Sequence, residues 1–217
     1  TTGLNVSAGG NRGMGMGRDE DESLLQRQSH TADDTSGGYL GTLATGNSIN
    51  ASVAADFGSD QAYVLMGDNG GFTCATGSGN AEAPTGIMNR FEREWKVTNT
   101  AFTGTFNWDF TNGCNSGPLS LADMHLLVDT DGNFLNATAY PAGGGLSFSV
   151  NAGVITVTGI STAHIPANST RFITIGFTAG VLPIELLRFD ATLQSDQTVL
   201  LEWETATEIN NDYFTIE

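Results

Sequence analysis

Residues 146–160, LSFSVNAGVITVTGI, decide the fold class of this chain. Apolar and small polar residues alternate on both sides of the turn sequence at 151–153, and successive side chains of a strand point to opposite faces. The stretch therefore predicts two strands joined by a tight turn, each strand with one face toward a core.

The same two-residue period recurs elsewhere in the chain. Trp95 and Val97 alternate with charged and polar neighbours, and residues 106–110 alternate in the same way. The apolar run at 62–66 leads into the turn sequence GDNGG and predicts a buried strand. Strands that recur about every ten residues, with glycine-rich turns between them, predict an all-β protein, an antiparallel β-sandwich.

Composition narrows the class of function. The chain has 217 residues, 24 acidic against 8 basic, and a net charge of −16. A nucleic-acid partner is not expected, because a nucleic-acid-binding protein presents a basic surface to phosphates. A membrane-spanning helix is not expected either, because no run of about 18 apolar residues occurs. Serine-hydrolase, P-loop and zinc-protease motifs are missing from the sequence, so we expect no enzymatic activity.

Two units are expected along the chain. Residues 1–181 form the sandwich, and their glycine-rich start, residues 1–17, reads as a flexible lead-in or an irregular first strand. Residues 182–217 follow, and Pro183 ends the preceding strand. The second unit has three strand-like runs, at 186–193, 198–204 and 213–217. Three strands are near the lower limit of independent stability, so we expect this unit to pack on the first, to pair with another chain, or to continue past residue 217.

The sequence LLVDTDGNF, residues 126–134, has two readings. Asp129, Asp131 and Asn133 stand at alternate positions and could supply three oxygen ligands to calcium, with Asp123 as a further carboxylate. The alternative is a hairpin in which Asp131 and Gly132 occupy a type I′ turn between two strands. Calcium is the one cofactor that the sequence indicates.

Cys74 and Cys114 lie in polar, glycine-containing segments, which is unusual for buried thiols. One disulfide between them would fit an oxidising compartment, and two free surface thiols are the alternative. The aromatic residues at alternating strand positions also have two readings, as core or as an exposed platform for sugars. Alternation favours the core.

Several short segments of the sequence together resemble one known group of proteins. GRDEDESLLQRQS, YVLMGDNGG, REWKVTNT, LLVDTDGNF and FITIGF occur in this order in large, secreted, adhesin-like surface proteins of the Bacteroidetes, which the type IX secretion system exports. The segment LPIELLRFDA to YFTIE resembles the immunoglobulin-like or fibronectin-III-like module that commonly follows this region. The resemblance implies a β-sandwich, with a short C-terminal immunoglobulin-like segment, located outside the cell or on its surface.

Three functions follow as hypotheses. The first is a non-catalytic structural or adhesion module of a bacterial cell surface, whose partners are copies of itself, other surface proteins or glycans. The second is a self-assembling subunit of an extracellular filament joined by β-strand complementation, with residues 1–17 as the donated strand. The third is a carbohydrate-active enzyme with a site across the two units.

Overall fold

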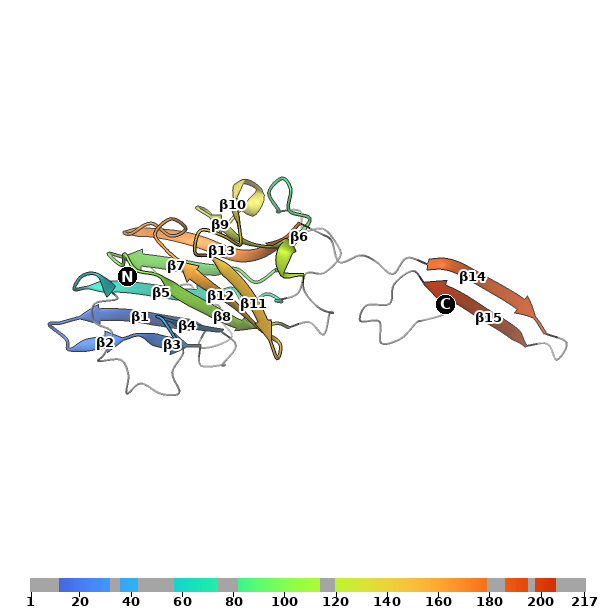
Figure 1. Ribbon diagram of the computed structural model, residues 1–217, viewed down its shortest axis with the longest axis horizontal. Coiled ribbons are helices and arrows are strands. Elements are labelled where there is room, and N and C mark those ends of the chain that lie inside the picture. Colours follow the sequence, from blue (N-terminus) through green and yellow to red (C-terminus); the bar gives the residue numbers. More distant parts are fainter. Residues whose placement is uncertain are drawn as a thin grey trace.

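The computed structural model describes residues 12–31, 36–42, 57–73, 82–113, 120–178, 186–194 and 198–205. Its regular elements are β-strands and short 3-10 helices, and the strands pair antiparallel in layers that pack on each other (Figure 1). This confirms the all-β antiparallel sandwich expected from the sequence. Within the described ranges, no helix has the length and apolar character needed to cross a membrane.

The larger sheet contains β1 (Gly13–Asp19), β2 (Leu24–Gln26), β5 (Ala62–Asp68), β6 (Asn89–Arg90), β7 (Trp95–Thr100), β9 (Met124–Asp129), β10 (Thr138–Pro141) and β13 (Ser169–Phe177). Across this sheet the order is β10-β9-β13-β7-β5-β1-β2, and β6 also pairs with β13. Two 3-10 helices, η3 (Leu121–Asp123) and η4 (Phe134–Asn136), flank β9 in the chain. The strand expected at 62–66 and the one expected from the alternation of Trp95 and Val97 are therefore confirmed.

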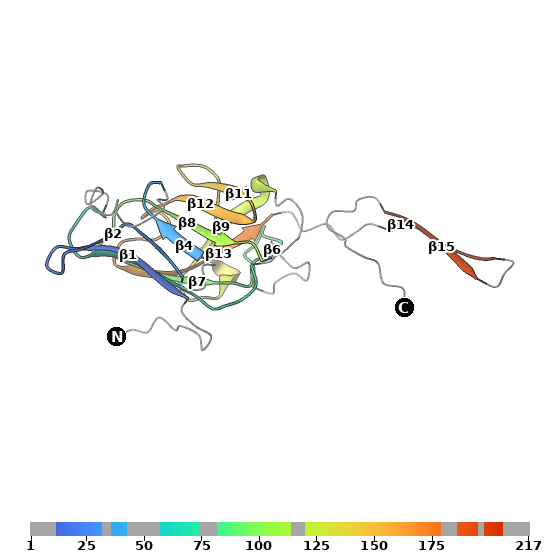
Figure 2. The ribbon, with the colours of Figure 1, turned by 90° about the horizontal axis from the view of Figure 1, so that it is seen from below.

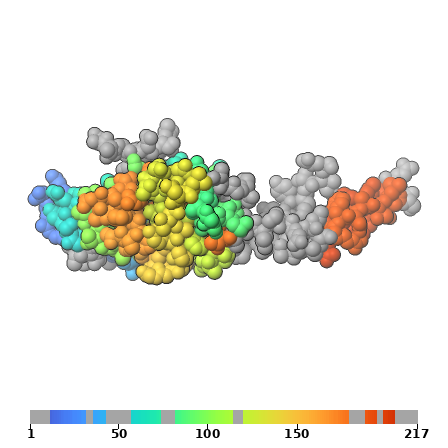
Figure 3. Space-filling view, turned by 90° about the horizontal axis from the view of Figure 1, so that it is seen from above, coloured from blue at the N-terminus to red at the C-terminus, as the bar shows by residue number. Residues whose placement is uncertain are grey.

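The smaller sheet contains β3 (Gln28–His30), β4 (Ser36–Tyr39), β8 (Phe106–Thr111), β11 (Ser147–Asn151) and β12 (Val154–Ile160), in the order β11-β12-β8-β4-β3. The opening stretch of the sequence folds as predicted, because β11 and β12 pair directly across the turn at residues 152–153. Figure 2 shows the two layers edge-on, and the yellow and orange surface of Figure 3 belongs to the segment from β9 to β13.

The chain crosses between the two sheets at both sides of the sandwich. On one side β2 of the larger sheet leads through Arg27 into β3 of the smaller one. Arg27 is buried, and its guanidinium donates to the carbonyls of Leu40 and Thr42. On the other side β10 leads through the glycine turn at 142–146 into β11. Short crossings of this kind join the edges of the two layers.

The first strand, β1, alternates glycine and methionine. Met14 and Met16 enter the core, and the intervening glycines face outward under the side chains of β5. A Cβ atom at Gly17 would lie 2.3 Å from Cδ1 of Tyr63, so a larger residue does not fit there. Residues 13–17 thus belong to a strand that pairs with β5 along its length and with β2 from Gly17 onward, so the first-strand alternative holds for this part of 1–17, and residues 1–11 lie outside the described residues.

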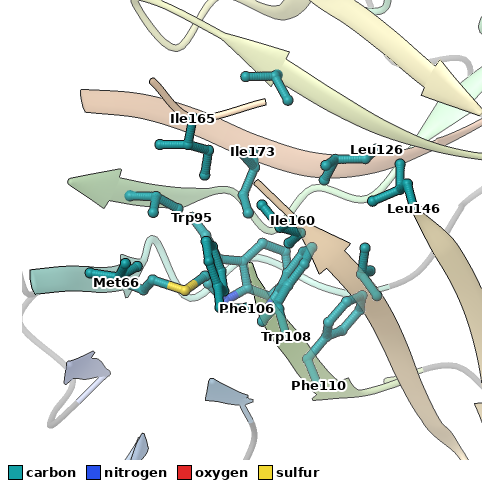
Figure 4. Close-up of a cluster of buried hydrophobic side chains, with 14 of the residues drawn as sticks. Met66, Trp95, Phe106, Trp108, Phe110, Leu126, Leu146, Ile160, Ile165 and Ile173 are labelled. Atoms are coloured by element: carbon teal, nitrogen blue, oxygen red, sulfur yellow. The ribbon is translucent and has the colours of Figure 1, made fainter. Parts of the chain in front are cut away.

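The core lies between the two sheets. Trp95 of the larger sheet and Trp108 of the smaller sheet meet at its centre, with Phe106 and Phe110 beside them (Figure 4). All four side chains are at most 2% exposed. The prediction that alternating aromatic residues belong to the core is therefore confirmed for these four residues.

The last described strands, β14 (Leu186–Leu193) and β15 (Val199–Thr205), form a separate two-stranded sheet. Figure 1 shows this hairpin apart from the two large sheets. Its bounds agree with the runs expected at 186–193 and 198–204. The third expected strand, 213–217, lies outside the described residues.

Candidate functional site

The loop after β9 is organised by one buried carboxylate. Asp129, the last residue of β9, is 3% exposed. Its Oδ2 accepts hydrogen bonds from the backbone N–H of Asp131 at 2.7 Å and of Gly132 at 2.5 Å. With its amide nitrogen turned toward the loop, Asn136 donates to Oδ1 of Asp129 at 3.1 Å. The Asp129 carboxylate therefore closes the turn from inside.

The next two polar residues repeat the pattern outside the core. Oδ1 of Asp131 accepts from the N–H of Asn133 at 2.9 Å, and Oδ1 of Asn133 accepts from the N–H of Leu135 at 3.2 Å, which caps η4. Only Gly132 in this loop has a positive φ, 92°, whereas a type I′ turn needs positive φ at both central residues. The type I′ turn is therefore wrong, although β9 and β10 do pair antiparallel.

Asp123 lies away from this loop. It precedes β9, whereas Asp129 ends it, so the two residues are about 20 Å apart at the rise of an extended strand. The Asp123 carboxylate accepts a hydrogen bond from the hydroxyl of Thr178 at 3.2 Å. Asp123 therefore cannot share an ion with Asp129. In the part of the chain that the structure describes, no group of three or more His, Cys, Asp or Glu side chains could hold a metal ion.

A buried arginine next to this loop, Arg90, was not predicted from the sequence. Arg90 is 6% exposed, and its Nη2 lies 3.1 Å from Oε2 of Glu82 and 2.9 Å from Oε1 of Glu94. Its guanidinium stacks on the ring of Phe134, 4.6 Å from the centroid. Burial raises the pKa of Glu94 against the opposing effect of Arg90, and Asp129 raises it further. Arg90 thus fastens η4 and the segment 82–94 to the outer face of the larger sheet.

The acidic run at 19–22 is also held by local contacts. The hydroxyl of Tyr63 donates to the carboxylate of Asp19, and Oδ1 of Asp19 accepts from the N–H of Glu22 at 3.3 Å. Arg18 pairs with Glu20. These contacts hold the turn between β1 and β2 against β5. The acidic run therefore has a structural role in the larger sheet.

The three histidines lie in different places. His30 and His125 each place Nδ1 3.0 Å from a nearby backbone carbonyl oxygen, those of Thr31 and Asp123. His164 is 8% exposed and accepts a hydrogen bond at Nδ1 from the N–H of Ser161 at 3.0 Å. Its burial lowers its pKa. Each imidazole ring thus makes its polar contact within its own turn or strand end.

The outer face of the smaller sheet is a polar surface that the strand register defines. Its outward positions form cross-strand rows, one of which runs from Ser149 through Thr156 and Asp109 to Gly37 and His30. The carboxylate of Asp109 extends over Gly37, where a Cβ atom would lie 2.3 Å from Oδ1. We call this surface the polar face; its outward positions are Gln28, His30, Gly37, Tyr39, Asn107, Asp109, Thr111, Ser147, Ser149, Asn151, Val154, Thr156 and Thr158.

The polar face differs in charge from the rest of the chain. Asp109 is its one carboxylate, whereas the chain carries 24 acidic residues. Burial, and then the charge of Asp109, raise the pKa of Tyr39, which stands in the neighbouring row. The face therefore presents mainly hydroxyl and amide groups, with the phenol ring of Tyr39, the imidazole of His30 and one carboxylate. The alternation in β11 and β12 predicted its polarity, but only the pairing of five strands reveals its extent.

Cys74 and Cys114 lie outside the described residues. Their chain neighbours Thr73 and Gly113 are hydrogen-bonded, because the N–H of Gly113 donates to Oγ1 of Thr73 at 2.7 Å.

A model of one protein family matches residues 8–164, which is most of the chain. The chain belongs to the DUF8202 family, a domain of unknown function. The DUF8202 match includes the loop after β9 and all five strands of the polar face, and it ends before β13. No curated protein and no solved structure matches the chain.

Proposed function

We propose that this DUF8202 protein is a secreted, non-catalytic module of a bacterial cell surface, and that it adheres through the polar face to neutral glycans. The resemblance of its sequence to exported adhesin-like proteins of the Bacteroidetes supports the location. The composition of the polar face supports the ligand, and this single observation carries the proposal.

Hydroxyl and amide side chains in regular rows suit a hydroxyl-rich polymer. Strands lie about 4.8 Å apart and outward residues about 6.7 Å apart along each strand, so donors and acceptors repeat in two directions. Ser149, Thr156 and Thr158 offer hydroxyls that both donate and accept. Asp109 can accept hydrogen bonds from sugar hydroxyls, and the half-buried ring of Tyr39 offers an apolar surface to a sugar ring.

The negative charge of the chain favours uncharged glycans over acidic ones. With a net charge of −16 the chain repels polyanions at low ionic strength, so acidic polysaccharides and nucleic acids are poor partners. A neutral polysaccharide carries no charge for the chain to repel. The polar face itself has one carboxylate, that of Asp109. The ligand class that fits best is therefore an uncharged glycan.

Binding of the full 217-residue chain to immobilised dextran, mannan and cellulose tests the proposal, with alginate as the anionic control. Thr156→Arg places a bulky side chain in the centre of the polar face. Thr98→Arg places the same side chain on the outer face of the larger sheet, where Thr98 pairs with Thr170. We expect binding to at least one neutral glycan that Thr156→Arg abolishes and Thr98→Arg preserves. Equal binding by both variants, or release of sugars from the polymer, would contradict the proposal.

A filament subunit is the second candidate function. The hairpin β14–β15 supports it, because in the described part of the chain each of these strands pairs only with the other and has a second edge for strand addition. Residues 13–17 are not free to be donated, because all five pair with β5 within the same chain, and Gly17 pairs with β2 as well. Electron micrographs of the concentrated protein test this function; regular fibres support it and dispersed particles count against it.

A further inference from the structure

The chain passes from the smaller sheet to the larger one through residues 161–168, which we call the β12–β13 connection. It begins with a tight turn, in which the backbone N–H groups of His164 and Ile165 donate to the carbonyl oxygen of Ser161 at 3.0 and 2.9 Å. Ile165 lies in the core (Figure 4), and its carbonyl oxygen accepts a hydrogen bond from the buried side-chain amide of Asn99 at 3.0 Å. The connection is therefore fixed both at its first turn and at Ile165.

The ring of His164 closes this turn. Its Nδ1 lies 3.0 Å from the backbone nitrogen of Ser161 and 3.3 Å from the hydroxyl oxygen of the same residue. A backbone N–H can only donate, so Nδ1 is the acceptor and carries no proton. The residue is 8% exposed, and its ring meets the ring of Tyr140 in β10 edge to face, with 4.8 Å between the centroids. A neutral imidazole thus joins the connection to the edge strand of the larger sheet.

The other two histidines of the chain use Nδ1 in the opposite sense. Nδ1 of His30 and of His125 each faces a backbone carbonyl oxygen, which can only accept, so in both rings Nδ1 carries a proton. A further proton on either ring leaves that hydrogen bond intact. On His164 it would instead turn the acceptor into a donor that points at the N–H of Ser161. Among the three histidines, His164 is therefore the one whose protonation breaks its own turn.

The surroundings of the His164 ring supply no charge that would favour the protonated form. The charged and titratable residues on the strands around the connection are Tyr140 of β10, His125 and Asp129 of β9, Arg171 of β13, Lys96 of β7 and Asp109 of β8. Tyr140 contacts the His164 ring, and within the described residues none of the others forms an ion pair or hydrogen bond with it. Burial is the one cause that shifts the pKa of His164, and it lowers that pKa. A proton on this ring would therefore be buried without a partner.

We propose that His164 is a pH-sensitive switch in the β12–β13 connection. While it is neutral, the ring accepts the N–H of Ser161 and keeps the turn closed against Tyr140. When Nδ1 takes up a proton from water, this hydrogen bond is lost, and the charged ring leaves its buried position for solvent. The turn then opens, while the core strands on either side stay paired. The switch does not require glycan binding by the polar face.

The direction of the pH dependence follows from the lowered pKa of His164. A histidine whose pKa is lower in the folded than in the unfolded chain stabilises the closed turn fully above its ordinary pKa of 6.5. This contribution is lost as the pH falls through the lowered pKa. Each unit by which the pKa is lowered corresponds to about a tenfold preference of the closed turn for the neutral ring. The turn is therefore closed at neutral pH and opens below pH 6.5.

NMR spectroscopy of the full 217-residue chain between pH 8 and pH 4 tests the switch. The ring proton shifts of His164 report its protonation, and the hydrogen-exchange protection factor of the Ser161 amide reports the closed turn. We expect His164 to titrate below pH 6.5, and the Ser161 protection factor to fall by about tenfold or more over the same pH range. The protection factor of Ile155, a core residue of β12, should stay constant over that range.

His164→Asn separates ionisation from packing. The side-chain oxygen of asparagine can accept the N–H of Ser161 and does not titrate, so we expect the Ser161 protection factor of this variant to be independent of pH. His125→Asn is the matched control, because Nδ1 of His125 faces a carbonyl oxygen, and it should keep the loss of protection seen in the unmodified chain.

The titration of the unmodified chain decides the matter even where His164→Asn does not fold. A His164 ring that titrates at or above pH 6.5, or that stays neutral until the whole chain unfolds, would overturn the proposal. So would an equal loss of Ser161 protection in the folded His164→Asn variant.

Discussion

The indole rings of Trp95 and Trp108 meet edge to face at the centre of the sandwich, with 4.5 Å between their centroids and 74° between their planes. Trp95 belongs to β7 of the larger sheet and Trp108 to β8 of the smaller one, so this contact joins the two layers. The two side chains differ in their polar atom. Nε1 of Trp95 donates to Oγ of Ser36 at 3.3 Å, whereas Nε1 of Trp108 is buried without a partner among the described residues.

This difference predicts unequal costs for the same substitution. Trp95→Phe and Trp108→Phe remove a similar volume from the core, and both destabilise the protein. Trp95→Phe also leaves the hydroxyl of Ser36 without its donor, so we expect it to cost about 1 kcal/mol more. Urea unfolding followed by circular dichroism measures both free energies of unfolding. An equal or larger cost for Trp108→Phe would contradict the assignment.

The glycines of β1 predict a position-dependent effect on stability. Gly17→Ala places a methyl group 2.3 Å from the ring of Tyr63, whereas at Gly13 the nearest atom is the carbonyl oxygen of Met66 at 3.9 Å. We expect Gly17→Ala to cost about 1–3 kcal/mol through steric strain and Gly13→Ala to cost nothing measurable. Thermal unfolding of the two variants checks this. If both melt with the unmodified protein, β1 does not pack on Tyr63 as described.

The hydrogen bond from Tyr63 to Asp19 predicts a pH dependence. The bond lowers the pKa of Asp19, and it is the first cause that raises the pKa of Tyr63 to about 12 from an ordinary 10.0. A phenol with a raised pKa in the folded state stabilises the protein fully below pH 10.0, and this contribution is lost as pH rises through about 12. The lowered pKa of Asp19 makes its contribution disappear as pH falls through that pKa.

Absorbance titration of tyrosinate between pH 9 and 13 measures this effect. Asp19→Asn should lower the pKa of Tyr63 toward its ordinary value, and Tyr63→Phe should remove the highest titration step. A titration curve that Asp19→Asn leaves unchanged would show that the two side chains do not interact.

The loop after β9 predicts a result for calcium. The Asp129 carboxylate already closes this loop through two backbone N–H groups, so we expect Asp129→Ala to cost about 2–3 kcal/mol. Asp131→Ala removes one exposed hydrogen bond and costs less than about 1 kcal/mol. Because the loop is closed by its own hydrogen bonds, removal of calcium with EDTA should leave the melting temperature unchanged. A rise in melting temperature with added calcium, abolished by Asp131→Ala, would instead assign the loop to calcium binding.

The chain neighbours of the two cysteines predict a disulfide. Thr73 and Gly113 are hydrogen-bonded, and Cys74 and Cys114 each follow by one residue, about 3.8 Å along the chain. We expect peptide mapping without reduction to yield a linked peptide that contains both cysteines. Quantitative labelling of two thiols in the unfolded, unreduced protein would contradict the bond.

The sandwich core was predictable because the two-residue period of a strand is a local property. Trp95 and Val97, like Phe106 and Trp108, alternate with polar residues, and this alone predicts which side chains point inward. The first strand was only one of two interpretations of residues 1–17, because glycine has low strand propensity and β1 is stabilised by Tyr63 and Leu65, which lie far away in the sequence.

The candidate sites were less predictable than the core because they depend on distances between elements. Asp123 is six positions from Asp129, but the intervening residues form an extended strand and separate the two carboxylates. Arg90 meets Glu82, eight positions earlier, and Glu94, four positions later, outside any helix, and no two-residue period predicts these contacts. The polar face needs the strand order of the smaller sheet, because its rows combine residues from β3 to β12.

Labelling of the intact cells that make this protein tests the central claim most directly. An antibody raised against the 217-residue chain would be applied to intact and to permeabilised cells, with an antibody to a cytoplasmic protein as control. A surface module predicts equal labelling of both preparations, and loss of the signal from intact cells after brief protease treatment. Labelling only after permeabilisation would contradict the surface role.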